Sequence, residues 1–425
     1  MIESVRRALS TPRPRASIAL AVASLLLAGC AQEDDADTQG STNDTPAALA
    51  SAFPGKKADG TPVRIGLITN EGGAGISQPE TREAADAARR YANDNLGGIA
   101  GRPIEYVICK TKEEPATARD CANRMVEQKV AAVVLTSSGL GDSMVPIVTR
   151  AGIPWTTALA TSGAEGTSNL AYSWTGGFPA SMTAMAEYAK KQGYKNVVTF
   201  VIDVPSAVGG AQSIGKPVFD KAGIGLRIVK VAVGTPDASP QVSAALQSKP
   251  DAVAIIGEST VCTSVLQAMD TLGGSTPRMV LQPCTAPAVV DAVGPGLDGA
   301  QVFSSFDVAS DHAEAQLYRA VMKRYSPDTP NGGYAAIGYQ GALGLVRALE
   351  GLSGEVTPKT VAKALDSAKD VALPAGHGTT FTCDSQAVPN LKAACSAKEV
   401  TATLNGGKLE KVEVIDPAPL FEQAG

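Results

Sequence analysis

Short apolar runs alternate with amphipathic stretches along most of the chain. Residues 63–68 (VRIGLI) form a run of strand length, which is typical of a parallel strand buried on both faces. We expect the next helix to begin with a capping box, with Ser77 as N-cap and Glu80 three residues later, and to end at Gly97-Gly98. The alternation then continues with strands at 104–109, 131–136 and 153–157, and with helices from 115 and over 142–150.

A second series of strands and helices begins after the break at Thr175-Gly176-Gly177. Its predicted strands are 196–202, 226–233, 251–256, 278–282 and 300–305, and its helices are 179–192, 210–222, 239–248 and 260–272. Three more helices follow, at 311–325, 335–350 and 355–367, and then a hairpin within 380–414. Two series of alternating strands and helices predict an α/β protein with two doubly wound, parallel-sheet lobes.

The first thirty residues carry an export pattern. Four arginines precede the apolar stretch 16–28, which is too short to span a bilayer and ends in Leu27-Ala28-Gly29-Cys30. This ending resembles the lipobox of bacterial lipoproteins, so we expect residues 1–29 to be removed and Cys30 to be lipidated. An ordinary secretory signal with a chance cysteine is the alternative. Residues 30–60 are polar and predict a flexible tether. The protein is thus expected to be exported and anchored by lipid to the outer face of the cytoplasmic membrane.

Composition narrows the partners and the chemistry. The net charge is −5, and the signal segment contributes +3 through four arginines and one glutamate, which leaves −8 on the mature chain. That charge argues against nucleic acid as a partner. The two histidines, His312 and His377, lie far apart in the sequence. A histidine-rich metal site and a conventional catalytic triad are therefore unsupported, and we expect neither a metal nor a cofactor.

Six cysteines besides Cys30 fall into three local pairs. Outside the cytoplasm an even number of cysteines favours disulfides. Six cysteines permit fifteen pairings, but sequential pairing is favoured because each pair brackets a short segment. We therefore predict the following disulfides: Cys109–Cys121, Cys262–Cys284 and Cys383–Cys395.

Hydroxyl side chains gather where two predicted strands end. Thr136-Ser137-Ser138-Gly139 follows the third strand, and Thr161-Ser162 follows the fourth. In open α/β sheets ligands bind at the carboxyl ends of the strands, where hydroxyls, backbone N–H groups and a helix N-terminus can hold a carboxylate. Plain N-capping would explain either segment alone, but the two together favour a ligand site.

Several segments in this order resemble the type I periplasmic binding proteins, in particular the branched-chain amino acid receptors of ABC importers. They are VRIGLITNEGG, DNLGGIAGRPIEYVICKT, VAAVVLTSSGLGDSMVPIVTRAGIPWTTALAT and YAAIGYQGALGLVRAL. The resemblance covers about residues 61–425 and implies two lobes joined by a three-segment hinge. Lobe one would comprise 61–175 and 304–352, and lobe two 176–303 and 353–425.

The resemblance also implies which residues hold the ligand. The family binds an amino acid's carboxylate with a serine after the third strand and a threonine after the fourth, and these places fall on Ser137 and Thr161. The Leu159 carbonyl would accept a hydrogen bond from the ammonium. Three further residues complete the lobe-one set: Asn70, Ser138 and Ala160.

Lobe two normally supplies a tyrosine and a glutamate to the ammonium, but here these places fall near Ser259 and Cys284. Glu258 or Asp203 would have to replace the missing groups. The resemblance thus implies a branched-chain or related amino acid. The departure leaves open a ligand without an ammonium, such as an amide, a urea analogue or an aromatic acid.

These features predict a receptor that closes two lobes on a small polar ligand and delivers it to an ABC permease, without catalysing a reaction. Two other classes remain open. A sensor subunit would present the bound state to a membrane kinase. An exported amidase would use Ser137 or Ser213, although no base is paired in sequence with either serine.

Overall fold

The structure is a computed structural model that describes residues 51–74, 76–272, 275–418 and 420. The expected signal peptide, the expected lipidation site Cys30 and the first part of the expected tether lie outside these residues. Within the described ranges, no helix is both long and apolar enough to cross a membrane.

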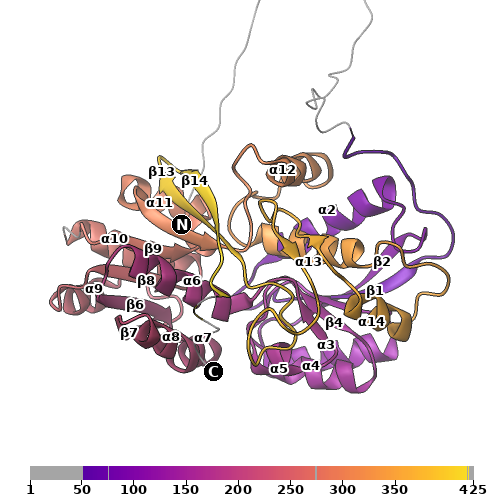
Figure 1. Ribbon diagram of the computed structural model, residues 1–425, viewed down its shortest axis with the longest axis horizontal. Helices are drawn as coiled ribbons and strands as arrows, with labels where there is room; N and C mark the ends of the chain where they lie inside the picture. The colour runs from indigo at the N-terminus through magenta and orange to yellow at the C-terminus, as the bar shows by residue number, and fades with distance from the viewer. Residues whose placement is uncertain (1–50, 75, 273–274, 419, 421–425) are drawn as a thin grey trace, which may run out of the picture. The chain divides into compact units, whose positions relative to one another are not determined.

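Lobe one is built on a five-stranded parallel sheet in the order β2-β1-β3-β4-β5 (Figure 1). The strands are β1 (Val63–Thr69), β2 (Ile104–Lys110), β3 (Val133–Leu135), β4 (Trp155–Thr157) and β5 (Ala171–Ser173). Helices cover both faces, because side chains of β1 point alternately into two separate cores. The helices are α2 (Pro79–Asn95), α3 (Pro115–Glu127), α4 (Gly141–Arg150), α5 (Gly163–Thr167), α12 (Ala313–Tyr325), α13 (Ala335–Ala348) and α14 (Pro358–Asp366).

Lobe two is built on a seven-stranded sheet in the order β14-β13-β10-β9-β8-β6-β7. Its parallel strands are β6 (Asn196–Ile202), β7 (Gly225–Val231), β8 (Ala252–Ile256), β9 (Arg278–Leu281) and β10 (Ala300–Ser304). The hairpin of β13 (Glu399–Asn405) and β14 (Lys408–Ile415) adds antiparallel strands at one edge. The α-helices are α6 (Gly177–Lys191), α7 (Pro205–Gly210), α8 (Lys216–Lys221), α9 (Ser239–Leu246), α10 (Ser259–Thr271) and α11 (Pro287–Val293). Short helical turns span Ala211–Gly215, Gln282–Thr285 and Gly294–Leu297.

Two helix predictions differ from the structure. The expected capping box at Ser77 and Glu80 is wrong, because α2 begins at Pro79 with Gln78 as N-cap and no side-chain cap. The Ser77 hydroxyl instead accepts a hydrogen bond from the Gly72 N–H at 3.0 Å within the preceding loop. The single helix expected over 210–222 is divided among α7, a five-residue π-helical turn and α8.

The chain passes between the two lobes at three places. It leaves lobe one between β5 and α6, and it returns between β10 and Phe306, which lies in the lobe-one core. The third passage follows Cys395, also in that core, and leads to β13. These passages confirm a fold of two α/β lobes joined by three segments.

The third passage lies later in the chain than the sequence suggested. Val361 and Leu365 of α14 are fully buried in the lobe-one core, and β11 (Val371–Ala372) and β12 (Thr380–Phe381) follow beside it. The assignment of the whole of 353–425 to lobe two is therefore wrong for residues 358–395. The apolar face of α14 completes the lobe-one core, and only the final hairpin joins the other sheet.

All three predicted disulfides are present. Cys109 at the end of β2 is bonded to Cys121 on α3, which ties an edge strand to the helix that covers it. Cys262 on α10 is bonded to Cys284, and Cys383 to Cys395. On the chain-entropy account, each closed loop contributes about 3 kcal/mol to the free energy of unfolding.

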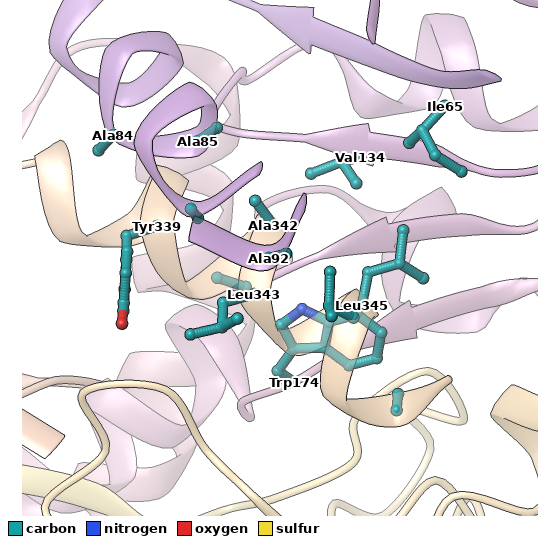
Figure 2. Close-up of a cluster of buried hydrophobic side chains, with 14 of the residues drawn as sticks. Ile65, Ala84, Ala85, Ala92, Val134, Trp174, Tyr339, Ala342, Leu343 and Leu345 are labelled. Carbon is teal, nitrogen blue, oxygen red and sulfur yellow. The ribbon is translucent and has the colours of Figure 1, made fainter. Parts of the chain in front are cut away.

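The contact between α2 and α13 anchors the lobe-one core, and it depends on small residues. Figure 2 shows Ala84, Ala85 and Ala92 of α2 near Ala342 and Leu343 of α13. Alanines and glycines let the backbones of α2 and α13 approach closely. Eight residues of α2 and thirteen residues of α13 are buried as a result. The helix α2 follows the loop after β1, where the candidate site begins.

Candidate functional site

A cavity of about 410 Å³ lies between the two lobes. Its wall contains residues that follow β1, β3 and β4 in lobe one, and residues that follow β6, β8 and β9 in lobe two. These are carboxyl ends of parallel strands, where open α/β sheets bind ligands. We call this space the interlobe cavity.

Six of the nine predicted ligand-binding residues line the interlobe cavity: Asn70, Ser137, Ser138, Leu159, Thr161 and Glu258. The other three, Ala160, Asp203 and Ser259, are not among the described lining residues. Asp203 is about half exposed and its carboxylate pairs with the Lys230 ammonium at 3.2 Å, so its charge is already matched outside the cavity. Asp203 is therefore poorly placed to receive a ligand's ammonium.

Asn70, Gln78 and Tyr334 form one side of the lobe-one wall. The Asn70 amide N–H donates to Gln78 Oε1 at 2.7 Å, and the Gln78 side chain also bonds the Tyr334 hydroxyl. Asn70 is 2% exposed, and its Oδ1 has no hydrogen-bond partner among the described residues. Burial raises the pKa of Tyr334 to about 12, so its hydroxyl keeps its proton at physiological pH.

Glu113 is a lining residue that the sequence analysis missed. Lys112 and Glu113 have φ values of 54° and 56°, in the left-handed region that non-glycine residues rarely adopt. This turn brings the carboxylate to the loop after β3, where it accepts from the Gly139 N–H at 2.6 Å and from the Ser138 hydroxyl at 2.9 Å. Burial raises the pKa of the Glu113 carboxyl, and these hydrogen bonds oppose the rise.

The donors of Thr161 are also occupied by protein groups. Its N–H donates to Glu165 Oε2 at 3.0 Å, and its hydroxyl donates to the Ser138 carbonyl at 2.8 Å. Glu165 also forms a capping box with Ser162 at the start of α5. By contrast, the Ser137 hydroxyl has no partner in the described part of the chain, and it is half-buried at the cavity wall.

Among the described lining residues, lobe two contributes one carboxylate, and that carboxylate caps its own helix. Glu258 is the N-cap of α10, and its two oxygens accept from the Thr260 and Val261 N–H groups at 2.6 and 3.0 Å. Cys284, at the place of the family's glutamate, is fully buried in its disulfide and does not line the cavity. Gln282 precedes it and does line the cavity.

The remainder of the wall is mostly apolar. Aliphatic and aromatic side chains from both lobes take part: Ile76, Leu140, Phe178, Ile202, Val204, Leu281 and Ile337. Ser181 of α6 also lines the cavity, and behind it lies the buried Glu399, whose carboxylate accepts from the Ser181 hydroxyl at 3.2 Å. A small ligand with an apolar body and one polar end fits such a wall.

Neither candidate serine has a histidine beside it in the described structure. His377 Nδ1 lies 2.8 Å from Asp307 Oδ2, and its ring centroid lies 4.8 Å from that of His312. Neither histidine is among the described residues that line the interlobe cavity. Ser213, the other candidate, is exposed and donates to the carbonyl of Gly209, four residues earlier in α7. Among the described residues, neither candidate serine is therefore paired with a histidine.

The same rule that found Ser137 and Thr161 could have found two of the missed residues. Glu113 follows β2 and Gln282 follows β9, so both lie at carboxyl ends of parallel strands. Gln78 and Tyr334 stand just before α2 and α13, and nothing in their local sequence indicates that they meet at this wall.

Comparisons with known proteins place this geometry in a family. Residues 62–395 match the family model described as periplasmic binding protein. Similar solved structures include the leucine binding protein LivK of Thermotoga maritima, with 23% identity over 84% of this chain and 99% of that chain and a TM-score of 0.69. They also include the branched-chain amino acid transporter substrate binding protein LivJ of Streptococcus pneumoniae in complex with isoleucine, with 21% identity over 84% and 100% and a TM-score of 0.69.

A fatty acid ABC transporter substrate-binding protein from Thermomonospora curvata has the same fold, with 16% identity over 85% of this chain and 94% of that chain and a TM-score of 0.66. At such identities the likeness shows the fold, and the three printed ligand types differ. No curated protein sequence matches the chain.

Proposed function

The chain belongs to the periplasmic binding protein family, and from this premise we propose that it is the receptor of an ABC importer, which closes its two lobes on a small ligand and presents it to the permease. One observation carries the proposal. The interlobe cavity lies between the carboxyl ends of two parallel sheets, and these sheets are joined only by three short passages of the chain within the described residues. Such passages allow hinge closure around a ligand.

The ligand class follows from the wall of the cavity. A volume of about 410 Å³ with a mostly apolar wall suits a small amphipathic compound. Branched-chain or related amino acids are the first candidates, by analogy with the leucine- and isoleucine-binding neighbours. Amides, urea analogues and aromatic acids are the second group, because the lobe-two carboxylate among the described lining residues, that of Glu258, already caps α10.

The receptor is proposed to work outside the cytoplasmic membrane, anchored through lipid on Cys30. The support is the Leu27-Ala28-Gly29-Cys30 sequence after a short apolar stretch and the polar segment that follows it. Changing Cys30 to Ser should move the exported protein from the membrane fraction to the soluble fraction, as checked by fractionation and metabolic labelling with a fatty acid. A variant that stays in the membrane fraction with its label would contradict the anchor at Cys30.

Ser137→Ala should weaken ligand binding by about 1–3 kcal/mol, because a ligand group buried against this hydroxyl would lose its partner. A thermal-shift screen of amino acids, amides, urea analogues and aromatic acids identifies the ligand, and calorimetry then compares the variant with the wild type. Ser213→Ala is the matched control, since Ser213 is exposed and is not among the described lining residues. Equal affinities for wild type and Ser137→Ala would remove Ser137 from the site.

A further inference from the structure

Several of the groups expected to hold a ligand's carboxylate are already bound by carboxylates of the protein. The Gly139 N–H and the Ser138 hydroxyl both donate to Glu113, at 2.6 and 2.9 Å. The Thr161 N–H donates to Glu165 at 3.0 Å. Of the hydroxyl groups at these two strand ends, only that of Ser137 is without a partner in the described structure.

The charge on the wall also opposes a carboxylate. Glu113 and Glu258 both line the interlobe cavity, and none of the described lining residues is a lysine, an arginine or a histidine. A ligand carboxylate placed beside Ser137 would meet the Glu113 carboxylate in a partly desolvated site, where like charges repel most strongly.

The wall instead offers acceptors to a ligand that carries N–H groups. Asn70 Oδ1 is buried at the cavity wall and has no partner among the described residues, so it lacks a donor. The Glu113 carboxylate retains lone pairs beyond those used by Ser138 and Gly139. The carboxylates of Glu113 and Glu258 each accept two hydrogen bonds from the protein, and these bonds offset their negative charge. A neutral N–H group of a ligand can therefore pair with them, and a cationic group is not required.

We propose that the interlobe cavity binds a carboxylate-free ligand of the amide or urea class, and that Glu113 determines this specificity by occupying the subsite that a ligand carboxylate would need. The ligand's N–H groups donate to Asn70 and Glu113, and its apolar body lies against Phe178 and its aliphatic neighbours. This inference rests on the proposed receptor function, and of the two ligand groups named there it selects the amides and urea analogues over the amino acids.

The test compares compounds that share a branched alkyl body but differ in the polar end: leucine, isocaproate, isocaproamide, isobutylurea and isoamylamine. Calorimetry on the wild type should show the amide or the urea binding at least ~10-fold more tightly than leucine, isocaproate and the amine. Glu113→Gln should reduce the preference over isocaproate to within about 3-fold, because it removes the repelling charge but keeps an acceptor for Gly139. Glu114→Gln is the matched control, since Glu114 is exposed and does not line the cavity.

Tight binding of leucine or isocaproate to the wild type would overturn the inference while supporting the receptor function. An unchanged preference in Glu113→Gln would overturn the role of Glu113, provided that the variant unfolds at the wild-type temperature. If that variant is destabilised, the preference for the amide or the urea over isocaproate is measured again with Glu113→Ala. Failure of all five compounds to bind would overturn the ligand class, whereas the receptor function would be decided by the broader thermal-shift screen.

Discussion

Replacing Glu399 with Gln should make the protein more stable at alkaline pH by roughly 4 kcal/mol, with little change near pH 5. Glu399 is 1% exposed at the start of β13, one hydrogen bond from Ser181 reaches its carboxylate, and its Oε1 has no partner among the described residues. Burial raises the pKa of this carboxyl to about 8, well above the ordinary value of 4.5. The folded protein therefore holds a proton here that the unfolded chain releases.

The sign of the pH dependence follows from this proton. Between about pH 4.5 and pH 8 the unfolded chain is ionised at Glu399 while the folded protein is not, so the free energy of unfolding falls as the pH rises. The slope from this group is about 1.4 kcal/mol per pH unit, and it ends above pH 8. The amide of Glu399→Gln does not titrate, so the variant lacks this component.

Denaturant unfolding at several pH values, with the disulfides intact, measures the effect. The difference between variant and wild type should grow steadily from pH 5 to about pH 8 and level off above it. Glu413→Gln is the control, because Glu413 is exposed on β14, opposite Thr401 of the strand that carries Glu399. Parallel pH profiles for wild type and Glu399→Gln would show that the buried carboxyl does not hold the proton.

Gly338→Ala should destabilise the protein by about 3 kcal/mol or more, or prevent folding. Gly338 lies on α13 where the helix crosses α2, and a Cβ atom there would overlap the Thr81 carbonyl. The clash is with backbone, so no side-chain rotation relieves it and the two helices would have to separate. Thr81 also contacts Thr136 through its hydroxyl at 2.8 Å, so separation would disturb the loop that carries Ser137.

Gly209→Ala is the matched control for that change. Gly209 also lies in a helix, α7, but a Cβ atom there would have no neighbour within 4 Å. The control should be neutral or stabilising by up to about 1 kcal/mol, because alanine restricts the unfolded chain. Equal melting temperatures for wild type and Gly338→Ala would contradict the close approach of α2 and α13.

The strands were predictable because both faces of each sheet are covered by helices. A strand buried on both faces reads as an apolar run, and the predicted strand 196–202 coincides with β6. The disulfides were predictable because each pair is local in the sequence. The positions of Ser137 and Thr161 at the cavity were predictable because both follow strands, and the carboxyl ends of parallel strands meet at one edge of the sheet.

The errors came from features that only tertiary structure decides. The apolar face of α14 would fit either lobe, and its sequence does not say that it completes the core containing Trp174. Glu113 follows a strand, which the strand-end rule could have shown, but its left-handed turn and its hydrogen bond to Gly139, twenty-six residues later in the chain, are tertiary features. Propensity and periodicity carry no information on such a contact. Asp203 was a plausible anion at a strand end, but Lys230 on the neighbouring strand pairs with it.

The most direct test of the account is a crystal structure of the protein with the compound that stabilises it most in the thermal-shift screen. The account predicts that the ligand lies in the interlobe cavity, in contact with Asn70 and Ser137 on one side and with Phe178 on the other. The alternative binding place is a second, larger groove beside α13 and α14, which is lined by Arg347 and Lys363. A ligand in that groove, with the interlobe cavity unchanged, would contradict the central claim.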